Sequence, residues 1–208
     1  MAVEEQLIKE GKLLPLMEAF YSIQGEGFHT GKSAYFLRIG GCDVGCYWCD
    51  VKESWDSNLH PLTKVEDIIS KIDKNIKTVV ITGGEPLMWN MDFLTNALKQ
   101  KEIEVHLETS GAYSLSGTFD WICFSPKKNQ QALDEIKSSA NELKIIVRNK
   151  HDLKWAVQQK ETVGSNCKLY LQPEWSKKEE VMSLITDFVM ENTSWQISLQ
   201  THKYMNLP

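Results

Sequence analysis

Short apolar segments recur along the chain, and they predict strands that alternate with helices. Each segment is rich in Val, Ile, Leu or aromatic residues, and most end at Gly, Pro, Ser or Asn, as strands closed by turns do. Strands that are apolar along their whole length are expected to be buried on both faces, which is typical of a parallel sheet covered by helices. The predicted strands are residues 33–41, 78–84, 104–111, 120–126, 142–149, 168–173 and 195–200.

The segments between these strands show helical periodicity. Thr63 and Glu66 have the spacing of a capping box with Thr63 as the N-cap, and apolar residues follow at helical spacing. Only eight residues, 112–119, separate two of the strands, which is too few for a crossover helix. A complete eight-fold (β/α) barrel needs a longer chain, so the pattern predicts an α/β fold, a mostly parallel partial (β/α) barrel in one domain over residues 1–208. The predicted helices are residues 65–72, 92–101, 151–160 and 177–191.

Composition and charge are those of a globular cytoplasmic protein. Hydrophobic residues make up 42% and charged residues 25% of the chain, and no apolar stretch approaches the roughly 18 residues of a membrane span. Residues 1–20 lack the basic region and cleavage site of a signal peptide, so the five cysteines are expected to stay reduced in the cytoplasm. A net charge of −5 disfavours a nucleic-acid partner.

Three of the five cysteines follow directly after the first predicted strand. Cys42, Cys46 and Cys49 have the spacing C-x3-C-x2-C, and glycines in the same loop let the backbone curl around a bulky inorganic group. Three interpretations compete: a structural zinc site, a set of inert buried thiols, and a four-iron cluster with one iron free of protein ligands. Zinc needs a fourth ligand, and no nearby residue has the usual spacing for it. The nearby candidates are Asp50, His29 and His60.

The cluster interpretation accounts for the missing ligand, because a small molecule can occupy the open iron. The triad, with Trp48 just before its last cysteine, resembles the signature of the radical S-adenosylmethionine (SAM) enzymes, which are partial (β/α) barrels. In that family the amino and carboxylate groups of SAM chelate the open iron. One electron from the cluster then cleaves a sulfur–carbon bond to give a 5′-deoxyadenosyl radical. The resemblance implies a [4Fe-4S] cluster held by the triad and SAM as cosubstrate.

Further motifs lie at the ends of predicted strands, where parallel sheets collect their functional groups. T-G-G-E-P alone indicates a sharp turn, but downstream of the triad it resembles the GGEP motif that contacts the methionine amino group in radical SAM enzymes. The other positions, taken singly, are more often strand-end caps. The SAM-binding residues implied by the resemblance are Trp48, Gly83, Gly84, Glu85, Glu108, Ser110, Ser125, Lys127 and Gln172.

A narrower resemblance covers residues 17–208. S-I-Q-G-E-G at 22–27, F-x-R-x-x-G-C around Arg38 and T-H-K-Y at 201–204 are similar to motifs of the 7-carboxy-7-deazaguanine synthase family. The resemblance implies a radical lyase of queuosine biosynthesis that contracts 6-carboxy-5,6,7,8-tetrahydropterin to 7-carboxy-7-deazaguanine and releases ammonia. In that family the radical takes a hydrogen from C6 and later returns it. A homodimer and a flavodoxin- or ferredoxin-like electron donor are also implied.

A flat heterocycle with a carboxylate suits the residues of these motifs. Gln24 and Glu26 can hydrogen-bond its edge, and Arg38 can pair with its carboxylate. His202 is the expected catalytic residue, moving a proton during ammonia loss, although a single histidine near a chain end is more often a packing residue. The substrate-binding residues implied by the resemblance are Ile23, Gln24, Gly25, Glu26, Arg38, Thr82, His202 and Pro208.

One position departs from the family pattern. The family clamps the substrate carboxylate with Mg²⁺, using a hydroxyl residue two positions after the last cysteine, where this chain has Val51. Valine has no side-chain oxygen, so the expected Mg²⁺ needs Asp50, Glu53 or Ser54 as a substitute ligand, or the metal is dispensable.

Two rival functions remain open at this level. An activase of a glycyl-radical enzyme shares the triad and GGEP, but its protein substrate does not call for the Q-G-E-G and T-H-K-Y segments. A zinc-binding interaction module would contain zinc and no iron. The remaining cysteines, Cys123 and Cys167, fall in or beside strands and are interpreted as small buried side chains.

Overall fold

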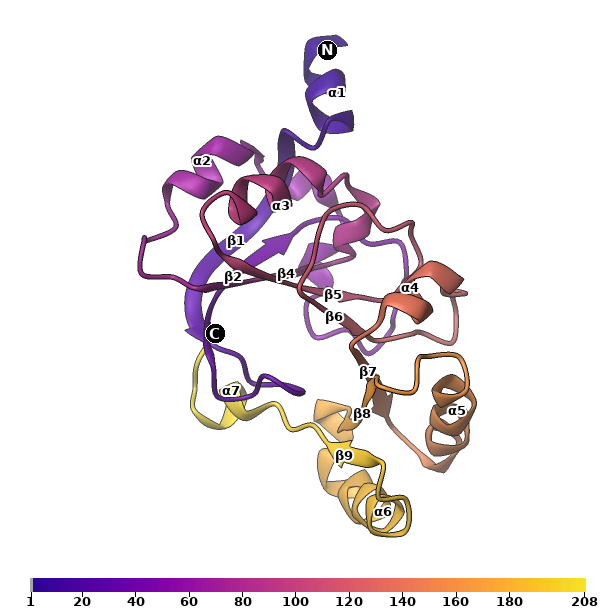
Figure 1. Ribbon diagram of the computed structural model, residues 1–208. Helices are drawn as coiled ribbons and strands as arrows, with labels where there is room; N and C mark the ends of the chain where they lie inside the picture. Colours follow the sequence, from indigo (N-terminus) through magenta and orange to yellow (C-terminus); the bar gives the residue numbers. More distant parts are fainter. Residues whose placement is uncertain (1) are drawn as a thin grey trace.

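Residues 2–208, the part of the chain described by this computed structural model, contain one nine-stranded sheet (Figure 1). The strand order is β3-β1-β2-β4-β5-β6-β7-β8-β9. Along this order, each strand from β2 onward is parallel to the next: β2, β4, β5, β6, β7, β8 and β9. β1 is antiparallel to both β2 and β3. The sheet curves without closing, which confirms the predicted α/β partial barrel. The strands are β1 Leu13–Ile23, β2 Ser33–Ile39, β3 Leu62–Lys64, β4 Thr78–Gly83, β5 Glu104–Thr109, β6 Trp121–Phe124, β7 Glu142–Val147, β8 Lys168–Pro173 and β9 Trp195–Ile197.

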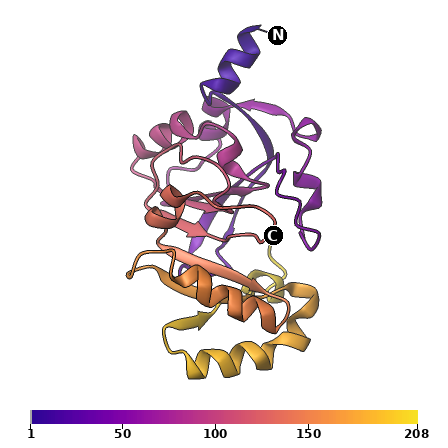
Figure 2. The same ribbon diagram turned by 90° about the vertical axis from the view of Figure 1, so that its right-hand side faces the viewer.

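Helices α2 to α6 cover the outer side of the curved sheet, and α1 projects from it and buries none of its residues (Figures 1 and 2). β5 and β6 pair in parallel although no helix connects them, as the short connection predicted. The α-helices are α1 Ala2–Lys9, α2 Val65–Ser70, α3 Asp92–Lys99, α4 Asp134–Ser139, α5 Lys150–Lys160, α6 Lys178–Glu191 and α7 Thr201–Tyr204. The short 3₁₀ helices are η1 Lys52–Ser54, η2 Ser57–Leu59, η3 Pro86–Met88 and η4 Trp175–Lys177.

All seven predicted strands and four predicted helices are present, but β1, β3, α1, α4 and α7 were not predicted. β1 contains Pro15 and an irregularity between Leu16 and Glu18, which break its strand pattern. The predicted capping box is wrong. Thr63 pairs with Leu14 as part of β3, its hydroxyl donates to Pro61 O at 3.1 Å, and α2 begins without a side-chain cap.

The two faces of the sheet differ in chemistry. The outer face packs fully buried apolar side chains against the helices. The inner face carries Arg38, Thr82, Glu108, Lys144 and Gln172, one each from β2, β4, β5, β7 and β8, and all five line one cavity. The fully buried outer side chains include Leu37, Ile81, Leu107, Phe124, Leu143 and Leu171. The curved sheet therefore holds an apolar core outside and a polar chamber inside.

The C-terminal segment closes the open side of this chamber. It runs from β9 through α7 to lie beside the loop that follows β1 (Figure 1). The amide and hydroxyl of Thr201 donate to Gly25 O at 2.9 and 3.1 Å, and Ser22 Oγ donates to Pro208 O at 3.3 Å. These bonds join the C-terminal segment to the end of β1 and to the loop that follows it.

Candidate active site

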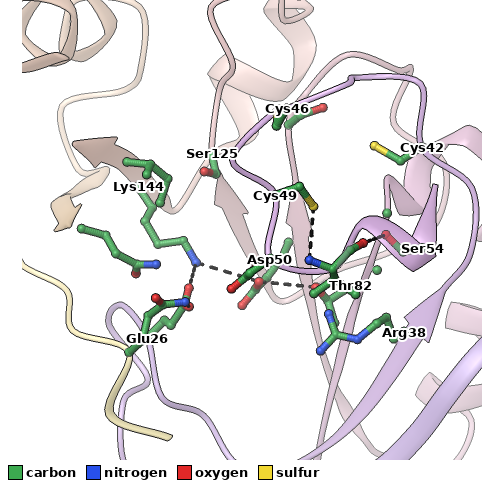
Figure 3. Close-up of a pocket in the computed structure, with 18 of the residues that line it drawn as sticks. Glu26, Arg38, Cys42, Cys46, Cys49, Asp50, Ser54, Thr82, Ser125 and Lys144 are labelled. Atoms are coloured by element: carbon green, nitrogen blue, oxygen red, sulfur yellow. Dashed lines mark hydrogen bonds and ion pairs between the residues drawn. The ribbon is translucent and has the colours of Figure 1, made fainter. Parts of the chain in front are cut away.

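The chamber contains a cavity of about 280 Å³. The three cysteines and every residue that the resemblance assigned to SAM or to the substrate line it, although the motifs are spread over most of the chain. Figure 3 draws part of this lining. The individual roles of these residues stay predictions. The residues are Ile23, Gln24, Gly25, Glu26, Arg38, Cys42, Cys46, Trp48, Cys49, Thr82, Gly83, Gly84, Glu85, Glu108, Ser110, Ser125, Lys127, Gln172, His202 and Pro208.

The cysteine triad lies on the loop after β2, at one side of the cavity. Two hydrogen bonds fix the start of this loop: the backbone amide of Cys42 donates to Trp55 O at 3.0 Å, and the Tyr113 hydroxyl donates to Asp43 Oδ2 at 2.5 Å. The three thiols are half-buried and unpaired, and burial raises the pKa of Cys42 and Cys46. Such thiols ionise readily only with positive charge beside them, which a bound metal centre supplies.

A closed zinc site is not assembled here. Two of the three candidates for a fourth ligand already have other partners. Asp50 forms an ion pair with Lys203 at 2.7 Å, and His60 Nε2 is hydrogen-bonded to Glu53 O at 2.9 Å. His29 lines a second, smaller cavity instead. The donor set of three soft thiolates beside an open cavity fits an iron–sulfur cluster with one iron available to a ligand.

The glycine turn after β4 packs directly on the cysteine loop. Gly84 N donates to Ile39 O at 3.0 Å and Glu85 N donates to Gly41 O at 2.8 Å. A Cβ atom on Gly84 would lie 2.3 Å from Gly41 O and 2.8 Å from Cys42 Cβ, so only glycine fits. The turn and the triad form one structural unit.

Gly84→Ala is therefore expected to displace the cysteine loop. The overpacking costs about 1–3 kcal/mol of folding free energy, and iron bound per chain after anaerobic reconstitution should fall clearly. Iron and sulfide analysis with thermal unfolding measures both effects. Gly164→Ala is the matched control, because nothing lies within 4 Å of its Cβ position. Full iron loading and unchanged stability in Gly84→Ala would show that the turn does not support the loop.

The Glu85 carboxylate is hydrogen-bonded to residues after β4 and at the end of β5 and does not point into the cavity as a free group. It is 1% exposed and accepts four hydrogen bonds, from Leu87 N at 3.2 Å, Thr109 Oγ1 at 2.6 Å, and the Ser110 amide and hydroxyl at 2.7 and 2.5 Å. The acceptors at this turn that remain for a ligand are backbone carbonyls. Glu85 thus places Ser110 at the cavity wall.

Lys127 and Ser125 form a polar group beside the triad. Lys127 Nζ donates to Ser125 O at 2.5 Å and to Ser125 Oγ at 2.8 Å, and it lies 5.7 Å from the centre of the Trp48 ring. Burial lowers the pKa of Lys127, and the neighbouring Cys46 opposes this effect. The ammonium can therefore neutralise negative charge at the triad.

A buried ion cluster forms the floor of the cavity, and its centre, Lys144, was missed by the sequence analysis. Lys144 Nζ lies 2.5 Å from Glu26 Oε2 and 3.9 Å from Glu108 Oε2. Gln24 Nε2 donates to Glu108 Oε1 at 3.1 Å, and Gln200 Nε2 donates to Glu26 Oε1 at 2.9 Å. The Lys144 side chain is 5% exposed. The signal was present, since Glu142 and Lys144 alternate within an otherwise apolar strand.

The ionisation of this floor follows from its contacts. Burial acts to raise the pKa of Glu26, but the charge and hydrogen bond of Lys144 outweigh it and lower the pKa to about 2. Burial also acts to lower the pKa of Lys144, and the surrounding acidic groups raise it well above the usual value. At neutral pH the floor therefore holds a carboxylate and an ammonium, both fixed by partners.

The remaining predicted residues close the cavity. Burial lowers the pKa of His202 although Glu26 opposes it, so the ring is neutral at pH 7 and packs against Gly25. Arg38 lines the cavity and its Nε donates to Glu18 on β1. Val51 presents only its backbone to neighbouring polar groups: its carbonyl accepts from Ser54 Oγ at 2.7 Å.

Comparison with known proteins agrees with this arrangement. Residues 37–122, which include the triad and the glycine turn, match the Radical SAM superfamily. None of the helices in residues 2–208 has the length and apolar character needed to cross a membrane. In the solved structures, a crystal structure of QueE from Escherichia coli superposes with a TM-score of 0.83 at 28% identity, over 94% of this chain and 97% of that one.

Relatives with named functions extend the match along the whole chain. A 7-carboxy-7-deazaguanine synthase of Flavobacterium psychrophilum is 57% identical over 97% of this chain and 96% of its own length. One from Synechocystis is 43% identical, covering 93% of both chains. The chain therefore belongs to the 7-carboxy-7-deazaguanine synthase family of radical SAM enzymes.

Proposed function

We propose that this chain converts 6-carboxy-5,6,7,8-tetrahydropterin to 7-carboxy-7-deazaguanine and ammonia. The observation that carries the proposal is one cavity lined both by the cysteine triad and by the Q-G-E-G floor with the C-terminal segment. A cofactor site and a site for a polar heterocycle would then share one chamber. The names of the relatives support the same reaction.

The triad would hold the [4Fe-4S] cluster, and the strand ends would hold SAM. The Gly83–Gly84 backbone is next to the triad, Ser110 is fixed by Glu85, and Lys127 carries positive charge at the cavity wall. When bound, cluster and SAM together supply a carbon-centred radical able to take hydrogen from the substrate. The assigned SAM residues are Trp48, Gly83, Gly84, Glu85, Glu108, Ser110, Ser125, Lys127 and Gln172.

The floor and the C-terminal segment would hold the pterin. Gln24 and Thr82 lie next to the acceptor Glu108, so amide and hydroxyl groups can meet both donors and acceptors on the heterocycle edge. Arg38 would pair with the substrate carboxylate in place of, or together with, Glu18. His202, neutral and near Glu26, would accept a proton during loss of ammonia.

The residues around Val51 do not fit the magnesium site of the family. Val51 offers no side-chain oxygen, the Ser54 hydroxyl donates to the Val51 carbonyl, and Asp50 is paired with Lys203. Glu53 is exposed and is not among the described residues that line the cavity. We propose that Arg38 binds the substrate carboxylate and that no side-chain hydroxyl of the protein ligates Mg²⁺ at this site.

Val51→Thr is expected to create a magnesium requirement. A hydroxyl two positions after Cys49 adds a hard oxygen ligand, so the KM of the variant for the pterin should fall about tenfold when Mg²⁺ is added. The wild-type KM should change less than about twofold under the same titration. Val51→Ala controls for the altered side-chain volume. A wild-type enzyme that already depends on Mg²⁺ as strongly as Val51→Thr would show that other groups hold the ion.

Three further features are proposed from the family alone. The enzyme is a homodimer, a flavodoxin- or ferredoxin-like protein supplies its electron, and it works in the cytoplasm. Sedimentation of the anaerobic protein tests the first of these, since a monomer at micromolar concentration would contradict it.

The decisive assay uses the anaerobically reconstituted enzyme with dithionite, SAM and the carboxytetrahydropterin. A 7-deazapurine chromophore and one equivalent of ammonia should form only when SAM is present. Deuterium at C6 should pass through the 5′ position of SAM and return to product. Formation of 5′-deoxyadenosine without any deazapurine would contradict the proposed substrate while leaving the radical SAM assignment intact.

A further inference from the structure

A second group of metal-ligating side chains lies away from the cysteine triad. His29 belongs to the loop after β1, and Glu104 and His106 belong to β5, with Glu104 as its first residue. The two histidines line a small cavity below the ion cluster of the floor, together with Trp121. His29 is 8% exposed and His106 is 3% exposed, so both rings are inside the protein.

These side chains are close together and lack the hydrogen bonds that burial normally requires. The possible ligand atoms of the three residues all lie within 4.8 Å of one another, and the centroids of the two imidazole rings are 4.3 Å apart. Within residues 2–208, neither ring nitrogen of His29 has a hydrogen-bond partner, and His106 Nε2 has none of good geometry. Buried polar atoms without partners are costly and need an explanation.

The carboxylate of Glu104 faces the same point. Its Oε1 lies 3.0 Å from His106 Nε2, but no well-directed hydrogen bond joins them. Its other oxygen accepts from Thr78 Oγ1 at 3.3 Å, which orients the group. Two ligands of one tetrahedral zinc ion, each about 2.0–2.1 Å from it, are about 3.3 Å apart. The 3.0 Å between Glu104 Oε1 and His106 Nε2 is close to this value, and His29 lies within 4.8 Å of both. The Glu104 side chain is 45% exposed, so water can reach a fourth position.

We propose that His29, Glu104 and His106 bind a zinc ion. Two imidazole nitrogens and one carboxylate oxygen are a common zinc donor set, and zinc binds such a site more tightly than ferrous iron does. The ion would give a partner to one ring nitrogen of His29 and to Nε2 of His106. It is separate from the cysteine triad and takes no part in the proposed reaction.

The position of His29 gives the ion a structural role. His29 lies three residues after Glu26 in the loop that forms the cavity floor, so a bond to β5 ties this loop to the sheet. The loop has other ties: the Phe28 ring stacks on Trp121 at 4.8 Å, and Gly27 N donates to Ser198 Oγ at 2.9 Å. Zinc would add a bond between the loop after β1 and β5, and this bond would fix the position of Glu26 relative to the substrate.

The test uses the iron-replete holoenzyme, in which the triad thiols are occupied by the cluster. After equilibration with micromolar zinc and dialysis, one zinc per chain is expected, with nitrogen and oxygen but no sulfur neighbours in its X-ray absorption spectrum. Glu104→Gln and His29→Phe should lose that zinc, whereas Glu102→Gln, an exposed neighbour on the same edge, should keep it. Zinc removal should lower the wild-type Tm by about 5 °C or more and leave the Tm of His29→Phe unchanged.

The alternative is a pair of histidines that serve only as packing groups. In that case the iron-replete enzyme retains no zinc, chelation does not change its Tm, and His29→Phe is as stable as wild type because an apolar ring replaces two unpartnered nitrogens. That result overturns the proposal, and so does zinc retained equally by Glu104→Gln and His29→Phe. Glu104 is half-exposed, so Glu104→Gln decides the matter even when His29→Phe does not fold.

Discussion

Cys46→Ala is expected to reduce turnover at least a thousandfold, because the reaction depends on a reactive species that protein side chains alone cannot generate. The triad supplies three thiolates from one loop, and the loss of one leaves a second iron without a protein ligand. Iron per chain should fall together with the absorbance near 400 nm. Cys42→Ala and Cys49→Ala should behave in the same way.

A matched control separates this effect from general loss of a thiol. Cys167 is a free cysteine that is buried beside β8, and burial raises its pKa to about 12. Cys167→Ala should keep its iron and its turnover, with only the modest stability loss of a small buried side chain. Full iron loading and turnover in Cys46→Ala would exclude this residue as a cluster ligand.

Lys144→Met is expected to have the largest effect on stability. The substitution removes the only lysine in contact with Glu26 and Glu108 within residues 2–208 and leaves both carboxylates without that cation inside the curved sheet. Breaking a buried ion pair at one partner costs about 3–5 kcal/mol. The floor of the cavity should also loosen, so the KM for the pterin should rise. Urea unfolding of the cluster-loaded protein measures the first effect and steady-state kinetics the second.

The loss should depend on pH in a defined direction. In the wild type the pKa of Glu26 is lowered from 4.5 to about 2, so its ion pair stabilises the fold fully above pH 4.5 and loses that contribution as the pH falls toward 2. In Lys144→Met the carboxylate has lost its cation and takes up a proton at higher pH. The stability gap between the two proteins should therefore narrow on going from pH 7 to pH 4.

Two controls distinguish the loss of the Lys144–Glu26 ion pair from the general effect of removing a lysine. Lys168→Met removes an exposed lysine from the neighbouring strand and should cost less than about 0.5 kcal/mol. Adding Glu26→Gln to Lys144→Met should recover part of the lost stability, because it removes the unpaired charge. A gap that is independent of pH, with additive effects of the two substitutions, would mean that Lys144 and Glu26 do not interact.

The predictable part of the site was the part encoded by local spacing. The triad, the glycine turn and the Q-G-E-G segment each carry their chemistry within a few residues, so they were identified without a fold. Lys144 was not, because its partner Glu26 is 118 positions away and only the curvature of the sheet brings them together. His29 was considered as a fourth ligand of the triad, but the loop after β1 carries it to the other cavity.

The fold divided along similar lines. The seven parallel strands, β2 and β4 to β9, were predictable because each lies in a short, mainly apolar run of the kind found in a parallel sheet covered by helices. β1 is interrupted by Pro15 and by an irregularity in its pairing, and it gave no clear strand pattern. The capping box at Thr63 failed because pairing with β1 outweighed a local helix signal.

The central claim is that three cysteines hold a four-iron cluster whose fourth iron is open to SAM. Mössbauer spectra of the ⁵⁷Fe-reconstituted enzyme, recorded with and without SAM, test it most directly. One iron site in four should change its isomer shift when SAM is added, while the other three stay as they were. The claim would be contradicted if no iron site changed its isomer shift when SAM is added, or if the triad bound zinc and no iron.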